Sequence, residues 1–336
     1  EIEFRGMTLT EEDLIQLFYY KFTETPLLKR MDAVKDYFID SWETLKGRNI
    51  SEDNQEMLQM KFDKMYTTKD IYTIYNWMLD DCGCDLLPEV PYEKRKLPYE
   101  DVFPMLYLKY RLSGGNSTHK NIKHLLIDEM QDYTYLQYTI LESLFHCRMT
   151  ILGDRAQTLD TKQQDVLRFL PKLLGREIRT IEIKKSYRNT LEIARYAEKV
   201  SGVSDLELLD RHGKEVVEKT FNTDTELLDE LVCHLKCPGD FETAALITTT
   251  EEEAFDLSRL LKLRGINVSY VDRNSSAFKK GLTVTTFYLA KGLEFDQVFA
   301  LRGAKENPLK NQAEYICATR ALHELYVYEI ADSLSK

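Results

Sequence analysis

Two adjacent carboxylates at the end of an apolar run are the strongest chemical signal in this sequence. The run is residues 124–127, which predicts a short strand, and Asp128 and Glu129 follow it at once. In open parallel sheets, ligands bind at the carboxyl ends of the strands. At such an edge we expect Asp128 to hold Mg²⁺, directly or through water, and Glu129 to polarise an attacking water molecule. The alternative is a strand that ends in a solvated acidic turn.

Four further motifs follow in chain order, and each is weak when taken alone. The first, residues 153–157, comes after a second apolar run and ends in Gln157, which is suited to orient a water or to contact a terminal phosphate. The other three are residues 185–189 with the sequence KSYRN, residues 285–296 with the sequence TTFYLAKGLEFD, and residues 315–321 with the sequence YICATRA. Five signals in this order do not arise by accident.

Together the five motifs resemble those of the superfamily 1 helicases of the UvrD/Rep type, from the second motif to the sixth. Within that superfamily the sequence is most similar to the HelD, or helicase IV-like, branch. The strings that carry this second likeness are residues 128–133, 288–296 and 97–101. The resemblance covers residues 96–336 well and residues 1–95 only loosely.

The resemblance implies a nucleotide site built from residues of all five motifs. Asp128 then holds the metal, and Glu129 is the catalytic carboxylate. The other implied contacts are those of Gln157 and Arg188 with the γ-phosphate, Tyr187 with adenine, Glu294 with the ribose, Gly292 where the backbone approaches the nucleotide, and Arg320 as the arginine finger. Thr286 and Tyr288 fall where this family touches single-stranded nucleic acid. The alternative for Arg188 and Arg320 is a surface salt bridge.

Three departures from the family pattern bear on function. The phosphate-loop sequence G-x-x-x-x-G-K-[ST] occurs nowhere and the chain does not begin with Met, so we expect the C-terminal part of a larger ATPase. The Trp-Arg pair that follows the third motif in UvrD-type enzymes is Lys162-Gln163 here. The 93 residues between Asn189 and Thr283 leave no room for the large inserted domain of those enzymes.

Helical spacing of apolar residues dominates the first 95 residues, and their Met and aromatic residues, including those between 57 and 78, are predicted to be core. After residue 98 the pattern of apolar residues changes. The predicted strands are 124–127, 149–152, 178–183, 244–247, 282–285, 297–301 and 325–328, and the predicted helices are 135–145, 163–174, 190–200, 224–236, 252–264 and 312–322. Strands that alternate with helices indicate an α/β fold with a mainly parallel sheet.

The resemblance adds a domain organisation to this α/β pattern. It implies RecA-like P-loop NTPase motor domains, each a parallel sheet with helices on both faces, preceded by a helical accessory segment. We place the helical accessory (1B-like) segment at residues 1–95, the C-terminal half of the first RecA-like domain at 96–175, and the second RecA-like domain at 176–336. The first boundary rests on the charged, Pro-containing stretch 88–98.

Composition excludes some classes of protein. The 336 residues carry a formal net charge of −11, which does not suit a purely electrostatic nucleic-acid binder but leaves room for a local basic groove. No run of about 18 apolar residues is present, so we expect no membrane-spanning helix and no membrane partner. There is no signal-peptide pattern and cysteine usage is ordinary, so the expected compartment is the cytoplasm. The Cys pairs at 82–84 and 233–237 lack zinc-finger spacing.

The function that the resemblance implies is an ATP-dependent helicase or translocase that uses ATP and Mg²⁺ to move on DNA, either single-stranded or as a tailed duplex. The alternative is a HelD-like remodelling ATPase that docks on RNA polymerase and has little strand-unwinding activity. A basic strand groove favours the first, and an acidic or blocked groove favours the second. In both cases the full-length parent is the expected enzyme, and this chain alone is expected to be inactive without a phosphate loop.

Overall fold

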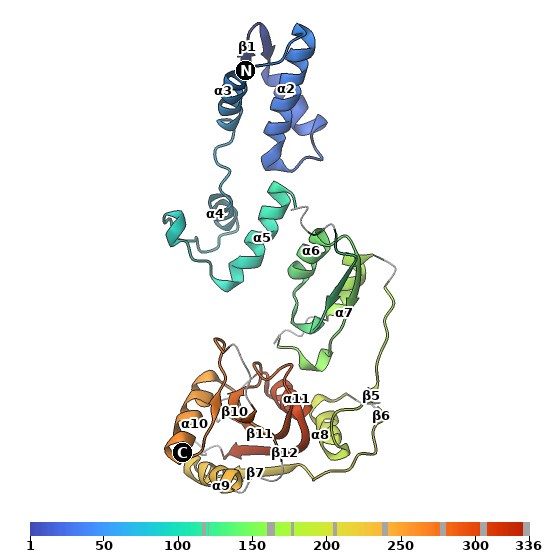
Figure 1. The fold of residues 1–336 in the computed structure, drawn as a ribbon, viewed down its shortest axis with the longest axis vertical. Coiled ribbons are helices and arrows are strands. Elements are labelled where there is room, and N and C mark those ends of the chain that lie inside the picture. The colour runs from blue at the N-terminus through green and yellow to red at the C-terminus, as the bar shows by residue number, and fades with distance from the viewer. Residues whose placement is uncertain are drawn as a thin grey trace. The chain divides into compact units, whose positions relative to one another are not determined.

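The computed structural model describes residues 1–115, 119, 121–159, 165–175, 178–203, 207–236, 241–275, 280–302 and 308–331. The chain forms two units, which are described one at a time. The first comprises residues 1–126 and 134–150, and the second comprises residues 127–133 and 151–336. Figure 1 follows the chain from its N-terminal hairpin in blue to its last strand in red. The division into three segments at 95/96 and 175/176 stays a prediction.

Helices make up most of the first unit (Figure 1). An antiparallel hairpin of β1 (Ile2–Phe4) and β2 (Met7–Leu9), which the sequence pattern did not predict, comes before them. The helices are α1 (Glu11–Ile15), a π-helical turn (Gln16–Lys21), α2 (Arg30–Lys46), α3 (Glu52–Asp63), α4 (Ile71–Asp81), α5 (Tyr99–Ser113) and α6 (Tyr135–Leu144). Short 3₁₀ turns lie at Leu27–Lys29 and Tyr92–Lys94. That this unit contains an accessory segment stays a prediction.

The core of the first unit lies where α2 and α3 meet the hairpin. Phe38 and Trp42 of α2 pack with Leu58 and Phe62 of α3, and all four side chains are buried. The prediction that the Met and aromatic residues between 57 and 78 are core is wrong for five exposed residues, which are Met57, Met60, Met65, Trp77 and Met78. In α3 the helix turns Leu58 and Phe62 inward instead. Met60 therefore lies on the outer face and is 62% exposed.

Two predicted strands carry the first motifs. These are β3 (His124–Ile127) and β4 (Arg148–Ile151), which pair in a two-stranded sheet. The strand predicted at 178–183 is wrong, because this segment makes no regular ladder and the side chain of Ile183 is 80% exposed. Alternating residues form a strand only where a neighbouring strand accepts their backbone hydrogen bonds. Here only β5 (Lys185–Ser186) finds a partner, the short β6 (Glu207–Leu208).

A six-stranded parallel sheet is the centre of the second unit. Its order is β7-β12-β11-β8-β10-β9, and each neighbouring pair is parallel. The strands are β7 (Val217–Phe221), β8 (Thr243–Thr248), β9 (Ser269–Tyr270), β10 (Gly281–Thr286), β11 (Phe295–Arg302) and β12 (Ala321–Ile330). The helices of this unit are α7 (Val166–Leu174), α8 (Leu191–Ser201), α9 (Asp224–Lys236), α10 (Glu251–Leu263) and α11 (Lys310–Arg320).

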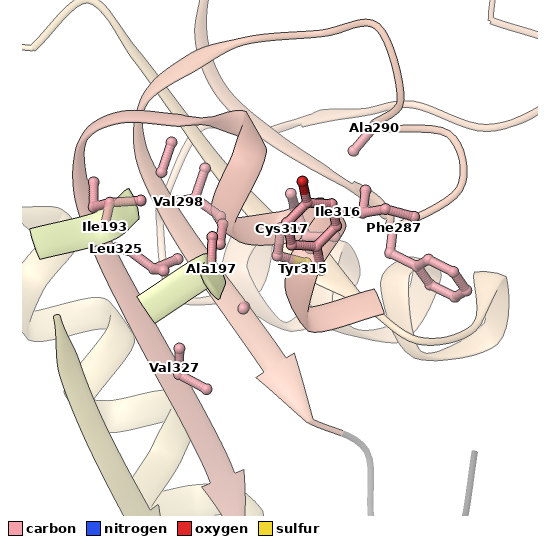
Figure 2. Packing of buried hydrophobic residues seen from close by; sticks show 14 of the residues in the cluster. Ile193, Ala197, Phe287, Ala290, Val298, Tyr315, Ile316, Cys317, Leu325 and Val327 are labelled. Carbon is pink, nitrogen blue, oxygen red and sulfur yellow. The ribbon is translucent and has the colours of Figure 1, made fainter. Parts of the chain in front are cut away.

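Helices cover both faces of this sheet, because successive side chains of a strand point to opposite faces. Ile247 of β8 packs with α8 and α11, in the cluster that Figure 2 shows around Ile193 and Ile316. Leu246, the residue before it, packs instead with α9 and α10 through Leu231 and Leu261. The α/β fold class with a parallel sheet is thus confirmed.

Candidate functional site

The two predicted catalytic carboxylates stand at a tight turn after β3. Glu129 has φ 53° and ψ 49°, a left-handed conformation that non-glycine residues adopt at an energetic cost of about 1–2 kcal/mol. Its backbone N–H donates to Asp128 Oδ1 at 2.8 Å, and a 3₁₀ turn, Met130–Asp132, follows. Strained backbone of this kind clusters at functional sites. The turn therefore sets Glu129 apart from an ordinary solvated acid.

Gln131 holds the side chain of Glu129 in place. Its Nε2 donates to Glu129 Oε2 at 2.5 Å, and its Oε1 accepts from the backbone N–H of Asp154 at 3.0 Å. Gly153 makes this contact sterically possible, because a Cβ there would lie 2.5 Å from Gln131 Oε1 and 2.4 Å from Met130 Cγ. Gln131 was not among the residues predicted from the sequence, although it lies within the string 128–133.

Lys291 also lies at the predicted site, although sequence reasoning missed it. Its Nζ lies 2.6 Å from Asp132 Oδ2 and 3.6 Å from Glu129 Oε2, and it donates to the backbone oxygen of Gln157 at 3.0 Å. Its side chain is only 8% exposed, so the ammonium group is committed to these acceptors. Its place beside Gly292, in a loop that begins at the carboxyl end of β10, is the sequence feature that could have identified it.

The segment after β4 joins the site through Gln157. The Gln157 side chain is buried, and its Nε2 donates to Asp154 Oδ2 at 2.9 Å. The same Asp154 oxygen accepts from the hydroxyl of Tyr315 in α11 at 2.8 Å. Burial, followed by the nearby carboxylate of Asp154, raises the pKa of Tyr315 above its ordinary value, so the phenol stays protonated and remains a donor.

Arg320, the last residue of α11, also contacts Gln157. Its Nη2 donates to Gln157 Oε1 at 3.2 Å and its Nη1 to the backbone oxygen of Leu293 at 3.4 Å, and the residue is 3% exposed. Burial lowers the pKa of Arg320, and the like charge of Arg188 lowers it further, while the surrounding carboxylates act in the opposite direction. Because Arg320 is buried, the alternative of a surface salt bridge is wrong for this residue.

Arg188 and Glu294, which were predicted to touch different parts of a nucleotide, contact each other. Arg188 Nε lies 2.7 Å from Glu294 Oε1, and both side chains are about half exposed. Tyr187, the residue before Arg188, is 65% exposed, and the ammonium group of Lys185 lies 5.5 Å from its ring centre. Gly292 has φ 78°, the left-handed region that favours glycine. The Arg188–Glu294 contact therefore brings the segment that carries Tyr187 next to the loop that carries Gly292.

The two residues predicted to contact nucleic acid are not both at the surface. The hydroxyl of Thr286 is buried at the end of β10 and has no hydrogen-bond partner within the described parts of the chain. The hydroxyl of Tyr288 donates to Glu251 Oε1 at 2.8 Å, and the guanidinium of Arg273 lies 5.9 Å from its ring centre. Lys162 and Gln163 lie outside the described residues. The nucleic-acid role of Thr286 and Tyr288 stays a prediction.

A magnesium ion at Asp128 fits the chemistry of this turn. The carboxylate is exposed, and oxygen is the ligand that Mg²⁺ prefers. Among the described residues, no group of three or more His, Cys, Asp or Glu side chains is arranged to hold a metal. Mg²⁺ usually takes one or two carboxylates and completes its shell with water and substrate phosphates, so a single Asp is a sufficient protein ligand.

Comparison with known proteins gives one family match. The family model of the UvrD/REP helicase N-terminal domain matches residues 11–159, a range that includes Asp128, Glu129 and Gln157. The match confirms the likeness to UvrD/Rep helicases over this range, and it begins well before the first motif. No curated protein matches the chain significantly.

A solved structure is also similar to part of the chain. It is the C-terminal domain of a possible DNA helicase from Lactobacillus plantarum WCFS1, with 25% sequence identity. The likeness covers 43% of this chain and 88% of that one, with a TM-score of 0.35. No helix in the described ranges is both long and apolar enough to cross a membrane.

Proposed function

We propose that this chain is part of a superfamily 1 DNA helicase or translocase, which couples ATP hydrolysis to movement on DNA. The observation that carries the proposal is the meeting of Glu129, Gln157, Arg188 and Arg320 in one unit. They come from four separate motifs, and Lys291 and Glu294 join them from a fifth. A purely structural cluster has no need of two arginines held near each other.

Glu129, Asp128 and Arg320 have different roles in the proposed phosphoryl transfer. Glu129 is the group that polarises the attacking water, and the Gln131 amide fixes the direction of one of its oxygens. Mg²⁺ bound at Asp128 supplies positive charge to the phosphate oxygens. Arg320 offers a guanidinium already removed from water, and charge stabilisation is strongest in such dry, preorganised sites.

The ion pair of Arg188 with Glu294 gives nucleotide binding a switching step. A triphosphate attracts Arg188, and a ribose hydroxyl gives Glu294 a hydrogen-bond donor, so both residues exchange their partner when nucleotide binds. Because the pair is about half exposed, it contributes no more than about 1 kcal/mol, and a charged phosphate easily competes with it.

ATP turnover requires a phosphate loop, which this sequence does not contain. Backbone N–H groups and a lysine of such a loop neutralise the β- and γ-phosphates, and no motif here replaces them. We therefore assign the ATPase activity to the full-length protein and expect the 336-residue chain alone to lack steady turnover.

The test is ATP-driven movement of the full-length protein on single-stranded DNA. We expect ATP turnover that rises when DNA is added, together with displacement of a protein block bound to the end of the strand. The matched reaction with a non-hydrolysable ATP analogue should show no displacement. ATP turnover that is absent with and without DNA would contradict the proposal.

One observation favours a second candidate, a remodelling ATPase that docks on RNA polymerase and unwinds little DNA. The Thr286 hydroxyl is buried and the guanidinium of Arg273 lies over the ring of Tyr288, so this loop offers few groups to contact bases. Weak unwinding of a tailed duplex, together with ATP-dependent release of RNA polymerase from nucleic acid, would support this candidate. Unwinding of tens of base pairs without an accessory protein would exclude it.

A further inference from the structure

We propose that Asn189 is a positioning residue, which holds Arg188 and Arg320 in a fixed relation so that both guanidinium groups meet the terminal phosphate of a nucleoside triphosphate. The inference rests on the proposed function, because that function assigns both arginines to the terminal phosphate. Asn189 itself does not contact the nucleotide. Its side-chain amide acts through the backbone on either side of Arg320.

The contact is a pair of hydrogen bonds that spans much of the sequence. Asn189 Nδ2 donates to the backbone oxygen of Ala318 at 3.1 Å and to that of Ala321 at 2.7 Å. These two carbonyls flank Arg320, and Asn189 directly follows Arg188. One amide group therefore connects the backbone of one arginine to the backbone of the other.

The end of α11 explains why a distant amide is needed there. The helix ends at Arg320 and β12 begins at Ala321, with no residue between them. The last carbonyls of a helix have no partner within the helix, and glycine or a loop usually satisfies them. Here Ala318 O accepts from Ala321 N–H and also from Asn189, so the two amide hydrogens of Asn189 complete the cap.

The backbone of Arg188 is held from a second side. Arg211 Nη1 donates to the backbone oxygen of Arg188 at 3.2 Å, and the backbone oxygen of Arg211 accepts from Leu191 N–H at 2.8 Å. The bend at 188–189 is thus fixed before the first turn of α8. Arg188 retains freedom in its side chain, which is about half exposed, while its backbone stays in place.

The positive charges of Arg188 and Arg320 explain why their backbones need to be held. Arg188 and Arg320 are close enough for the charge of one to lower the pKa of the other, so they repel each other. A repulsive pair stays together only if other contacts hold it, and the Asn189 bonds are uncharged and add no further repulsion. The γ-phosphate of a triphosphate neutralises both cations, whereas a diphosphate lacks that group.

The test compares the affinity of the full-length protein for a non-hydrolysable ATP analogue with its affinity for ADP. Asn189→Asp keeps the size of the side chain but replaces the donor with an oxygen that faces two carbonyls, and Asn189→Ala removes the group. We expect both variants to lose about three- to tenfold in affinity for the triphosphate and less than about twofold for ADP. Calorimetric titration gives both constants.

Asn76→Ala is the matched control. Asn76 also bonds a distant backbone, since its Nδ2 donates to Leu87 O and its Oδ1 accepts from Leu87 N–H, both at 3.0 Å. It belongs to the first unit and to no motif, so its loss should leave the ratio of the two affinities unchanged. A general loss of folding would lower both affinities together.

Hydrogen exchange of the nucleotide-free protein separates the possible failures. Asn189→Ala should speed exchange at residues 316–322, the junction of α11 and β12, and Asn76→Ala should not. Faster exchange with an unchanged affinity ratio would show a structural cap and overturn the positioning role. Wild-type protein that binds neither nucleotide would overturn the proposed function and the positioning role with it.

Discussion

The ammonium group of Lys291 lies 3.6 Å from the carboxylate of Glu129, the residue expected to polarise the attacking water. The two residues are far apart in the sequence, and the lysine is almost fully buried while it also holds Asp132. The positive charge of Lys291 offsets the electrostatic repulsion between the carboxylates of Glu129 and Asp132, which lie at one turn. The loop after β10 is thereby tied to the turn after β3.

This relationship predicts a large stability effect at Lys291. Lys291→Ala should lower the free energy of unfolding by about 1–3 kcal/mol, because it leaves the acceptors of a buried donor without their partner. Lys280→Ala is the control, since its ion pair with Glu242 is exposed and should contribute less than about 1 kcal/mol. Urea unfolding measures both, and equal effects of the two variants would contradict the prediction.

The parallel sheet could be predicted from sequence because its strands are buried on both faces. Residues 244–247 and 297–301 are therefore nearly continuous apolar runs, and β8 and β11 include them. Helix α5 was missed because Pro98 and Pro104 suggest a break, although Pro98 only precedes the helix and Pro104 lies within it. A local pattern cannot tell a tolerated proline from one that ends a helix.

The candidate site was predictable only in part, for a related reason. Glu129, Gln157 and Arg320 carry recognisable motifs, and the structure brings them together. Lys291 and Gln131 were missed because their importance depends on partners that only the fold supplies. Asp132 and Lys291, for example, are 159 residues apart.

A methyl group at Gly153 should disturb the catalytic turn. Gly153→Ala places a Cβ 2.7 Å from Met130 N and closer still to Met130 Cγ, so the turn that carries Glu129 must shift. We expect a loss of about 1–3 kcal/mol in stability, as overpacking usually causes, and a reduced ATPase rate. Gly115→Ala is the control, because its nearest neighbour would be Ser143 O at 3.9 Å. A shift of thermal midpoint no larger than that of the control would refute the steric account.

The pair of the exposed His212 and the largely buried Glu192 should make stability depend on pH. His212 Nδ1 lies 2.8 Å from Glu192 Oε1, and the hydrogen bond raises the pKa of His212 while it lowers the pKa of Glu192 from 4.5 to about 2. The His212 contribution is fully present below pH 6.5 and is lost as pH rises through its raised pKa. The Glu192 contribution is present above pH 4.5 and is lost as pH falls towards 2.

His212→Ala is the variant that tests this pair. The stability difference between wild type and variant should be largest between about pH 4.5 and 6.5 and should shrink on either side. Denaturant unfolding at a series of pH values gives the difference directly. A difference that grows above pH 8 would have the wrong sign.

Removal of the buried guanidinium should slow the chemical step. Arg320→Ala and Arg320→Lys in the full-length protein should both reduce the rate of ATP hydrolysis in a single turnover, in a family of reactions where such a finger contributes about 10³–10⁵ in rate. The lysine variant retains a charge but not the donors to Gln157 and Leu293. If Arg320→Ala leaves the rate within about threefold of wild type, Arg320 is not the finger.

The ATPase rate of Glu129→Gln in the full-length protein tests directly whether Glu129 activates water for ATP hydrolysis. The substitution keeps the shape of the side chain and removes its ability to accept a proton. We predict a loss of steady turnover of at least about 10²-fold, with the affinity for a non-hydrolysable ATP analogue within about threefold of wild type. Turnover that persists at the wild-type rate would contradict the account.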